Sequence, residues 1–453
     1  MRTLMAMLLF ALTGCDTLWA PYIERYSSDS ATNQGFPGSL EVSYPLSQQY
    51  MLMATGNYDG DANDVADVAV SGVFATDRFN ASTANPAAVE IYIGDGQGGL
   101  KLDGSCLASP MERVVYLLTV PTAGKAGAND ILVATEDSSV FLCSKASGAW
   151  SSSAVKTSGG VFNGFKLLAL ANNEPQGSLP DLVVRTGINQ FTDHSTTTSS
   201  LHVYRADGPN SFGKMRIPVA TADITWVLPY RFSGAQGDSL AITWDNPLVN
   251  PGVNFHYIAQ DNIGRNQGSG QTAAVNVAGT PFPELKNVAF TALASLHTLD
   301  PVEQIARTAI LLTDTQDKNS VAVLYGPTVE GFGIQAQQTN LMAGGFMLPY
   351  AGDADGDMND EIGLYTSAPN KNPLIRHLMI LSYKKNSIDI VTPIADITNP
   401  TENFRAMALE YLGDGNDLRR QRQRKDLIAL VEDPQKGSSR LLVRRSDLNY
   451  RFP

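Results

Sequence analysis

The chain repeats one pattern of polar and apolar positions: a Gly-rich polar turn, an acidic residue, and a run in which apolar side chains alternate. The stretch "GNYDGDANDVADVAVSG" (56–72) shows all three parts, and six further stretches repeat their order. The equivalent positions of the seven copies are Asp67, Asp130, Asp181, Asp238, Thr308, Glu361 and Asp426. Their average spacing is about 60 residues, and self-similarity at a roughly constant period indicates a modular fold.

Each copy predicts four short β-strands. An apolar segment precedes the turn, as "YMLMATG" does in the first copy, and a second alternating segment such as "AVEIYIGDGQGG" follows. Several copies end with a further strand, and we find no helical period in them. We therefore expect an all-β fold, a seven-bladed β-propeller of four-stranded antiparallel blades, because radial packing protects the edges of the sheets.

One strand is predicted before the first copy. The segment "GSLEVSYPLS" (38–47) alternates like the other strands but belongs to no copy, and the last copy ends close to Pro453. We expect this N-terminal strand to complete the seventh blade and close the ring. The propeller would then occupy residues 39–453.

The N-terminus predicts a lipid anchor. Arg2 precedes an apolar run, Leu4–Leu12, that is too short to span a bilayer. The run ends in "LTGC", which resembles the bacterial lipobox, whereas a core helix or an ordinary signal peptide is the alternative. The resemblance implies a lipoprotein signal peptide at 1–14, lipidation of Cys15 and a flexible tether at 15–38. The protein would then be anchored in the bacterial cell envelope, at the outer membrane (periplasmic face or cell surface) or at the inner membrane.

The loop "GDADGDMNDEIGL" (352–364) predicts a calcium site. Calcium takes six to eight oxygen ligands, usually carboxylates and carbonyls of a tight turn. Acidic residues at alternate positions supply such ligands, and a glycine lets the loop curl. The alternative is an acidic turn held by hydrogen bonds from its Asp and Asn side chains. The predicted ligands are Asp353, Asp355, Asp357, Glu361 and a carbonyl near Asn359.

A second calcium loop is predicted at 56–68. Asp59, Asp61 and Asp67 belong to it in either of two alignments, of which one adds Asn57 and the other adds Asn63. A third loop, 413–426, begins in the same way but carries a basic run, and those charges would repel a cation. We predict that the third site is lost and that the run is either a solvated insertion or a contact to lipid phosphates or an acidic partner. The run contains Arg419, Arg420, Arg422, Arg424 and Lys425.

The turn and the strand after it resemble the FG-GAP/VCBS repeat, the unit of the integrin α-subunit propeller and of many bacterial surface proteins. The consensus of that repeat, roughly G-D-x-x-G-D-G-x-x-D-L, is matched by 352–362 and 56–68. The copies that contain Asp130 and Asp181 match only its second half. The resemblance covers about residues 39–453 and implies a propeller fold of the integrin type.

Composition and the absence of catalytic motifs argue against some classes of function. The net charge of −12 argues against nucleic acid as a partner. Besides Cys15, the chain has Cys106 and Cys143, which either form one disulfide or remain unpaired. No His, Ser or Cys belongs to a recognisable catalytic motif.

We therefore predict a non-enzymatic, membrane-anchored binding or scaffolding lipoprotein. Its partner would be another envelope or surface protein or a surface polysaccharide. Two alternatives stay open. A carbohydrate-binding, lectin-like propeller would need aromatic pockets that recur between blades, and a glycan hydrolase or lyase would need a polar cluster in the central funnel.

Overall fold

The computed structural model describes most strands of the chain and several of the turns that join them. The described residues are 41–61, 65–71, 87–109, 114–122, 125, 127–135, 139–157, 168–171, 180–186, 200–208, 211–216, 223–230, 238–245, 255–258, 273–274, 290–299, 306–314, 321–328, 331–338, 346–352, 360–367, 377–384, 387–396, 401–413 and 425–445. The predicted signal peptide, Cys15 and the predicted tether lie outside them. No helix within these ranges has the length and apolar character that crossing a membrane requires.

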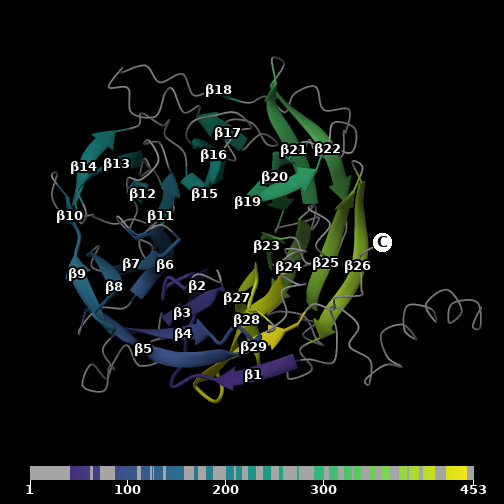
Figure 1. Ribbon diagram of the computed structural model, residues 1–453. Coiled ribbons are helices and arrows are strands. Elements are labelled where there is room, and N and C mark those ends of the chain that lie inside the picture. Colours follow the sequence, from purple (N-terminus) through teal and green to yellow (C-terminus); the bar gives the residue numbers. More distant parts are fainter. Residues whose placement is uncertain are drawn as a thin grey trace, which may run out of the picture.

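The described elements are all strands, and they form seven sheets that follow one another around a common centre (Figure 1). The first blade contains β2 (Leu52–Gly56), β3 (Asp67–Ser71), β4 (Ala87–Gly94) and β5 (Leu100–Ser109). The second contains β6 (Val114–Pro121), β7 (Asn129–Thr135), β8 (Val140–Ala146) and β9 (Ala149–Ala154). In these two blades neighbouring strands follow one another in chain order, and the fold is a β-propeller.

The remaining sheets continue around the ring (Figure 1). The third sheet contains β10 (Lys156–Thr157), β11 (Leu168–Ala171), β12 (Asp181–Thr186), β13 (Ser200–Gly208) and β14 (Ser211–Arg216), and the fourth contains β15 (Asp223–Tyr230), β16 (Ser239–Asp245), β17 (Phe255–Ile258) and β18 (Ala273–Ala274). The fifth contains β19 (Phe290–Leu299), β20 (Ala306–Asp314), β21 (Val321–Thr328) and β22 (Gly331–Gln338), and the sixth contains β23 (Phe346–Gly352), β24 (Glu361–Ser367), β25 (His377–Lys384) and β26 (Ser387–Asp396). The last blade contains β27 (Asn403–Glu410), β28 (Asp426–Asp433) and β29 (Ser438–Arg444).

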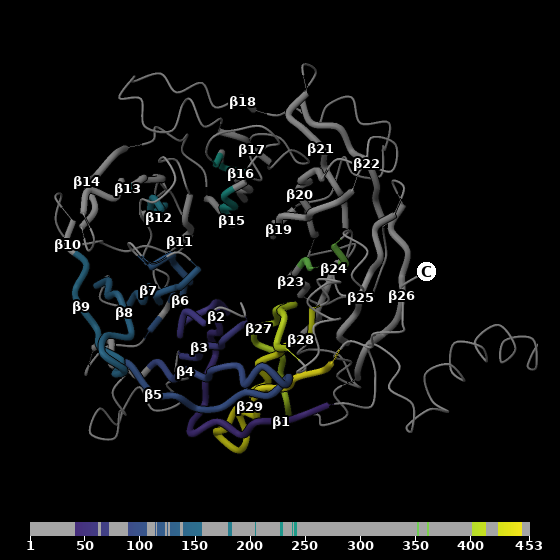
Figure 2. The backbone as a smooth tube through the Cα atoms, in the orientation of Figure 1, coloured from purple at the N-terminus to yellow at the C-terminus, as the bar shows by residue number. Residues whose placement is uncertain are grey.

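The N-terminal strand β1 (Glu41–Pro45) joins the last blade. It pairs antiparallel with β29, from Glu41 opposite Arg444 to Pro45 opposite Arg440. The described beginning and end of the chain therefore lie side by side in one sheet (Figure 2). Residues 46–50 then lead from this outer strand to β2, the innermost strand of the first blade.

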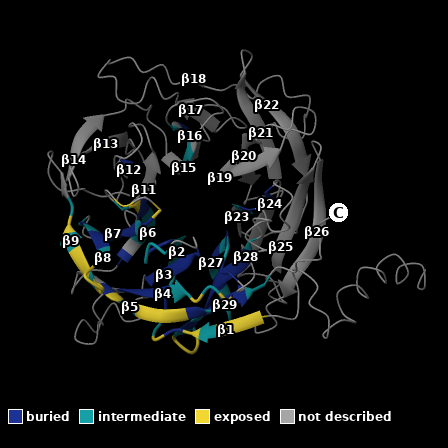
Figure 3. Cartoon of the chain, viewed as in Figure 1, coloured by how far each residue is buried: buried dark blue, intermediate teal, exposed yellow. Residues whose placement is uncertain are grey.

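The core lies between blades rather than within them. In β3, Val68 and Val70 pack toward the last blade, whereas Ala69 packs toward the second blade. All five residues of β3 and all eight of β28 are buried, because middle strands are covered on both faces. The outer strands β1, β5 and β9 carry the exposed residues (Figure 3). Burial on both faces explains the nearly continuous apolar runs after each turn.

The repeated acidic position has a common structural place. Asp67, Asp181, Glu361 and Asp426 are each the first residue of the second strand of a blade, and Asp130 is the second residue of β7. All five side chains are buried, with exposed fractions of 8% or less. Asp238, which comes directly before β16, is half-buried. The sequence period therefore marks buried carboxylates where the chain enters the second strand.

A disulfide joins two blades. Cys106 on β5 and Cys143 on β8 are bonded, with their Cα atoms 6.1 Å apart. Both residues lie in the apolar cluster between the first and second blades. The sequence left this pairing open, since spacing alone does not show whether two cysteines can reach each other.

Candidate functional site

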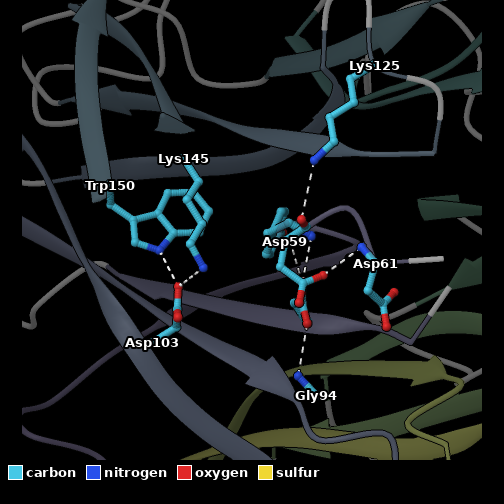
Figure 4. A network of polar contacts seen from close by, with 9 residues as sticks. Asp59, Asp61, Gly94, Asp103, Lys125, Lys145 and Trp150 are labelled. Carbon is cyan, nitrogen blue, oxygen red and sulfur yellow. Dashed lines mark hydrogen bonds and ion pairs between the residues drawn. The ribbon is translucent and has the colours of Figure 1, made fainter. Parts of the chain in front are cut away.

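The acidic loop of the first blade connects β2 to β3. Asn57, Asp59, Asp61 and Asp67 are described, whereas Asn63 lies outside the described residues. Figure 4 shows Asp59 and Asp61 with the lysine and the glycine backbone that surround them. The structure therefore describes three of the four residues that the sequence predicted as ligands here, together with Asn57 from the alternative alignment.

Asp67 binds backbone amides. Its Oδ2 accepts hydrogen bonds from the amides of Tyr58, at 2.6 Å, and Asp59, at 3.1 Å. Its Oδ1 accepts one from the amide of Gly94, at 2.9 Å. A carboxylate has about four acceptor positions, so roughly one of them, on Oδ1, remains for another ligand. The side chain ties the loop to the end of β4.

The electrostatic environment of Asp67 favours a cation. Burial, and next the negative charge of Asp59, raise the pKa of Asp67 to about 7, although the three amide hydrogen bonds work in the opposite direction. The two carboxylates therefore repel each other across a poorly solvated loop. A positive charge placed near both would remove that repulsion.

Two polar side chains of the loop, Asn57 and Asp59, bond to the backbone of Asp61. Asn57 Oδ1 and Asp59 Oδ1 both accept from the amide of Asp61, at 3.1 and 2.9 Å. Asn57 Nδ2 also donates to the carbonyl oxygen of Asp61, at 2.9 Å. Gly60 has a φ of 67°, which lets the chain bend at this point. Asn57 and Asp59 therefore surround the amide of Asp61, and the ligand pattern predicted from the sequence stays a prediction.

Residues of the second blade form hydrogen bonds with this loop. The amide of Asn57 donates to Asn129 Oδ1, at 2.8 Å, and the amide of Asn129 donates to the carbonyl oxygen of Asn57, at 2.7 Å. Lys125, in the turn between β6 and β7, donates from Nζ to the carbonyl oxygen of Asp59, at 3.4 Å (Figure 4). A Cβ built on Gly60 would lie 2.3 Å from that Nζ. The lysine ammonium therefore occupies the space directly above the bend.

The donor set suits calcium by chemistry but is not assembled around one point. Among the residues that the structure describes, no three His, Cys, Asp or Glu side chains form a group that could hold a metal ion. The amide bonds of Asp67 account for part of this, since they turn its carboxylate toward the backbone. The contacts of this loop include hydrogen bonds from Asn57 and Asp59 to the backbone of Asp61, and Lys125 Nζ bonds to the carbonyl oxygen of Asp59.

The acidic loop of the β23–β26 blade is described only at its ends. Asp353, Asp355, Asp357 and Asn359 lie outside the described residues. Glu361 begins β24 and is completely buried, and Asp360 before it is 8% exposed. Gly352 ends β23 and pairs with Glu361. Glu361 therefore occupies the position that Asp67 holds in the first blade.

The basic run of the last blade is likewise outside the described residues, except for its last member. Lys425 directly precedes the buried Asp426. Its Cδ would lie 3.2 Å from a Cβ built on Gly352. The end of the basic run therefore lies against the beginning of the acidic loop of the neighbouring blade.

Trp150 on β9 contacts residues of both the first and the second blade. Its Nε1 donates to Asp103 Oδ2, at 2.8 Å, and Lys145 forms an ion pair with the same oxygen, at 2.7 Å (Figure 4). Lys145 Nζ lies 5.9 Å from the centre of the indole ring, and Tyr58 meets the ring edge-on at 6.5 Å. These contacts fasten the second blade to the first.

Sequence reasoning missed the residues that neighbouring blades contribute. Lys125 and Asn129 of the second blade contact the loop although they lie far from it in the chain, whereas Gly94, which bonds to Asp67, belongs to β4 of the same blade. The only available signal was the repeat itself, because it predicts that turns of successive blades lie next to one another.

No protein-family model matches the sequence, and no curated protein matches it. Among solved structures, the chain is similar to the β-propeller domain of Myceliophteria thermophila Cps50 (Swd1), with 11% identity, a TM-score of 0.48, and coverage of 89% of this chain and 99% of that chain. It is also similar to Saccharomyces cerevisiae Sqt1, with 10% identity, a TM-score of 0.47 and coverage of 89% and 98%. For the Dos1 propeller the values are 12%, 0.44, 90% and 80%. None of these likenesses informs the function, and the propeller fold is established by the sheets themselves.

Proposed function

We propose that this protein is a non-enzymatic binding or scaffolding lipoprotein, anchored in a bacterial cell envelope and stabilised by calcium. The observation that carries the proposal is the loop at 57–67, where Asn57 and Asp59 turn inward around the amide of Asp61. Such a loop holds a cation without offering an obvious reaction centre. The rigid body around it would then present the outer surface of a propeller to a partner.

The proposal includes a specific architecture. Each of the seven sheets corresponds to one blade, and β1 closes the ring by completing the last blade, as its pairing with β29 suggests. The repeated unit is of the FG-GAP/VCBS type. The support for that assignment is the recurrence of one buried carboxylate at the start of the second strand, which the consensus also places there.

Two calcium sites follow from the proposal. In the first blade, Asp59 and Asp61 would hold the ion with Asn57 or Asn63 and the remaining acceptor of Asp67. In the β23–β26 blade, Asp353, Asp355, Asp357 and Glu361 would do so with the carbonyl near Asn359. Bound calcium would supply positive charge between carboxylates that otherwise repel, and so join the ends of two strands.

Location and partner are the remaining parts of the proposal. Lipidation of Cys15 would hold the propeller near a membrane through the tether at 15–38. The disulfide between Cys106 and Cys143 supports a compartment outside the cytoplasm, since reducing compartments rarely keep such bonds. The partner would be another envelope or surface protein or a surface polysaccharide.

Calcium titration tests the metal-binding part. We expect the chelator-treated protein to bind calcium with a Kd of about 10⁻⁴–10⁻³ M, as extracellular modules do. Calcium at tenfold excess over Kd should stabilise the fold by roughly 1.4 kcal/mol per site. Asp355→Ala should remove one of two binding events, Asp59→Ala the other, and Mg²⁺ should replace calcium poorly. Absence of heat in the wild-type protein would refute calcium binding.

Lipid labelling tests the anchor. Wild-type protein expressed in bacteria should incorporate a labelled fatty acid and partition with membranes, whereas Cys15→Ser should do neither. Labelling that persists in Cys15→Ser would refute the anchor without affecting the calcium sites.

A further inference from the structure

We infer that three side chains form a latch over the disulfide between the first and second blades, so that a thiol reductant reaches this bond only when the latch opens. They are Asp103, Lys145 and Trp150, and they join β5 of the first blade to β8 and β9 of the second (Figure 4). The inference goes beyond the proposed function and depends neither on calcium nor on the lipid anchor. It makes the disulfide a site of thiol–disulfide exchange whose access is controlled by a neighbouring contact.

On the second blade, the latch lies directly beside the disulfide. Cys143 on β8 pairs with Ser152 on β9, and the next pair that points to the same side is Lys145 with Trp150. Side chains of a strand alternate between its two faces, so the indole and the cysteine face the same way. The latch and the bond are therefore neighbours on one face of this blade.

The first blade leaves room for the indole at the matching place. Gly104 on β5 stands two residues before Cys106 and so belongs to the same face of its strand. A Cβ on Gly104 would lie 2.9 Å from Trp150 Cδ1, so the ring lies directly against this glycine. Trp150 also meets the ring of Tyr58 edge-to-face and packs against the apolar cluster that contains both cysteines. The indole therefore fills the space between the blades next to the bond.

The bond and the latch differ in their exposure to solvent. Cys106 is 1% exposed and Cys143 is completely buried. The side chains of Asp103 and Lys145 are 28% and 24% exposed, and Trp150 is half-buried. The latch thus reaches solvent where the bond does not, and an opening of the latch is the shortest way to expose the bond.

One carboxylate holds the latch closed. Asp103 Oδ2 accepts a hydrogen bond from Trp150 Nε1, at 2.8 Å, and forms the ion pair with Lys145, at 2.7 Å. Burial raises the pKa of Asp103, but the hydrogen bonds from Lys145 and Trp150 outweigh it and lower that pKa below its usual value. Because these contacts are partly exposed, they open at a much smaller cost than the unfolding of a whole blade. Opening of the latch is therefore a local event.

Reduction of the bond by dithiothreitol reports on this opening. A thiolate of the reagent attacks one cysteine sulfur, the bond between the two cysteines breaks, and the released thiolate takes up a proton. The second thiol of the reagent then displaces the other cysteine and closes a cyclic disulfide. The reagent is oxidised, and two protein thiols appear for each bond that is reduced.

The test measures the rate of this reduction in the full-length protein by alkylation of the released thiols and mass spectrometry. A Cys15→Ser background leaves only the two cysteines of the bond in the chain. Asp103→Ala removes the acceptor of both contacts, Trp150→Ala removes the indole, and Trp150→Phe keeps a ring but loses its N–H group. The matched control is Arg444→Leu, which removes a partly exposed ion pair to Glu41 at the outer edge of the last blade.

We expect Asp103→Ala and Trp150→Ala to be reduced about tenfold faster than their parent, and Trp150→Phe about threefold faster, with Arg444→Leu unchanged. Urea below the unfolding transition should change the parent's rate by less than about twofold, whereas a reaction that required global unfolding would speed up more than about tenfold per molar urea. Rates of Asp103→Ala and Trp150→Ala equal to that of the parent would overturn the inference, and so would an equal acceleration by Arg444→Leu or a parent rate that follows global unfolding. If Trp150→Ala does not fold, the comparison of Asp103→Ala with the parent decides.

Discussion

The two junctions that flank the first blade are closed by different physical means. Toward the second blade, an apolar cluster is crossed by the disulfide between Cys106 and Cys143, and hydrogen bonds of Asn129 and Thr119 are also present. Toward the last blade, an apolar cluster is also present, but polar groups surround it. At this second junction the described beginning and end of the chain lie together, and residues 46–50 lead from β1 of the last blade to β2 of the first.

Two groups of polar contacts join the last and first blades, one around Arg445 and the other around the segment 47–50. At one end, Arg445 donates to the carbonyl oxygens of Gln97, at 2.7 Å, and Gly413, at 2.6 Å, and forms an ion pair with the buried Asp426, at 3.4 Å. A Cβ on Gly98 would overlap its guanidinium.

At the other end, the segment that leads into β2 is held by buried carboxylates. Ser47 donates to Glu90, and Gln49 donates to Glu432. The amide of Tyr50 donates to Ser439 Oγ, at 2.9 Å. Arg445 and buried carboxylates thus take part in this junction, whereas a disulfide crosses its neighbour in addition to hydrogen bonds.

The largest expected effect on stability comes from removing the disulfide between the first and second blades. Replacing both Cys106 and Cys143 with alanine removes a bond between residues 37 positions apart, which should cost about 4 kcal/mol through the entropy of the unfolded chain. For a body of this size, the melting temperature should fall by about 5 °C. Differential scanning calorimetry measures it. Because both cysteines are buried, added reductant should leave the folded wild-type protein largely unchanged, and rapid reduction at room temperature would contradict the structure.

A somewhat smaller effect should follow from removing the arginine of the polar junction. Arg445→Leu leaves the buried carboxylate of Asp426 without its guanidinium, and breaking a buried ion pair typically costs about 3 kcal/mol or more. We expect a melting temperature about 3–4 °C lower. The matched control is Arg444→Leu, which removes an ion pair to the exposed Glu41 and should cost less than about 1 kcal/mol. Equal losses in the two variants would show that Arg445 has no special role at the junction.

Much of this architecture could be predicted from the sequence, because it follows from local patterns. Alternating apolar residues predict the strands, and the repeated acid marks the first or second residue of several second strands, as at Asp67 and Asp426. Local periodicity also predicted a strand before the first copy, and β1 lies there.

The junctions could not be predicted in the same way. The contact between Arg445 and Gln97 joins residues 348 positions apart, and nothing near either one in the sequence indicates the other. The same holds for Lys125 above Asp59 and for the disulfide. Repeats of one sequence pattern specify blades of similar shape, whereas the contacts between blades depend on residues that differ from copy to copy. The same distinction applies to the candidate site, because its acidic residues belong to the repeated pattern and Lys125 does not.

The smallest and most discriminating comparison uses two threonines at equivalent positions of neighbouring inner strands. Thr119 on β6 donates from Oγ1 to the carbonyl oxygen of Thr55, at 2.6 Å, and lies 2.7 Å from the hydroxyl of the buried Tyr58. Thr55 on β2 donates from Oγ1 to Glu410, at 2.8 Å, across the polar junction. Thr119→Val leaves a buried hydroxyl and a carbonyl without that partner, which should cost about 1–2 kcal/mol. Thr55→Val removes one donor from a half-buried carboxylate that water can reach, and should cost about 0.5 kcal/mol. Chemical unfolding of the two variants, measured in low and high salt, checks both values. Only the Thr55→Val difference should shrink as salt rises, because only that contact involves a charged group. If Thr55→Val destabilises the protein more than Thr119→Val does, water does not reach the carboxylate of Glu410 as its half-buried position indicates. The two junctions would then not differ at these inner strands.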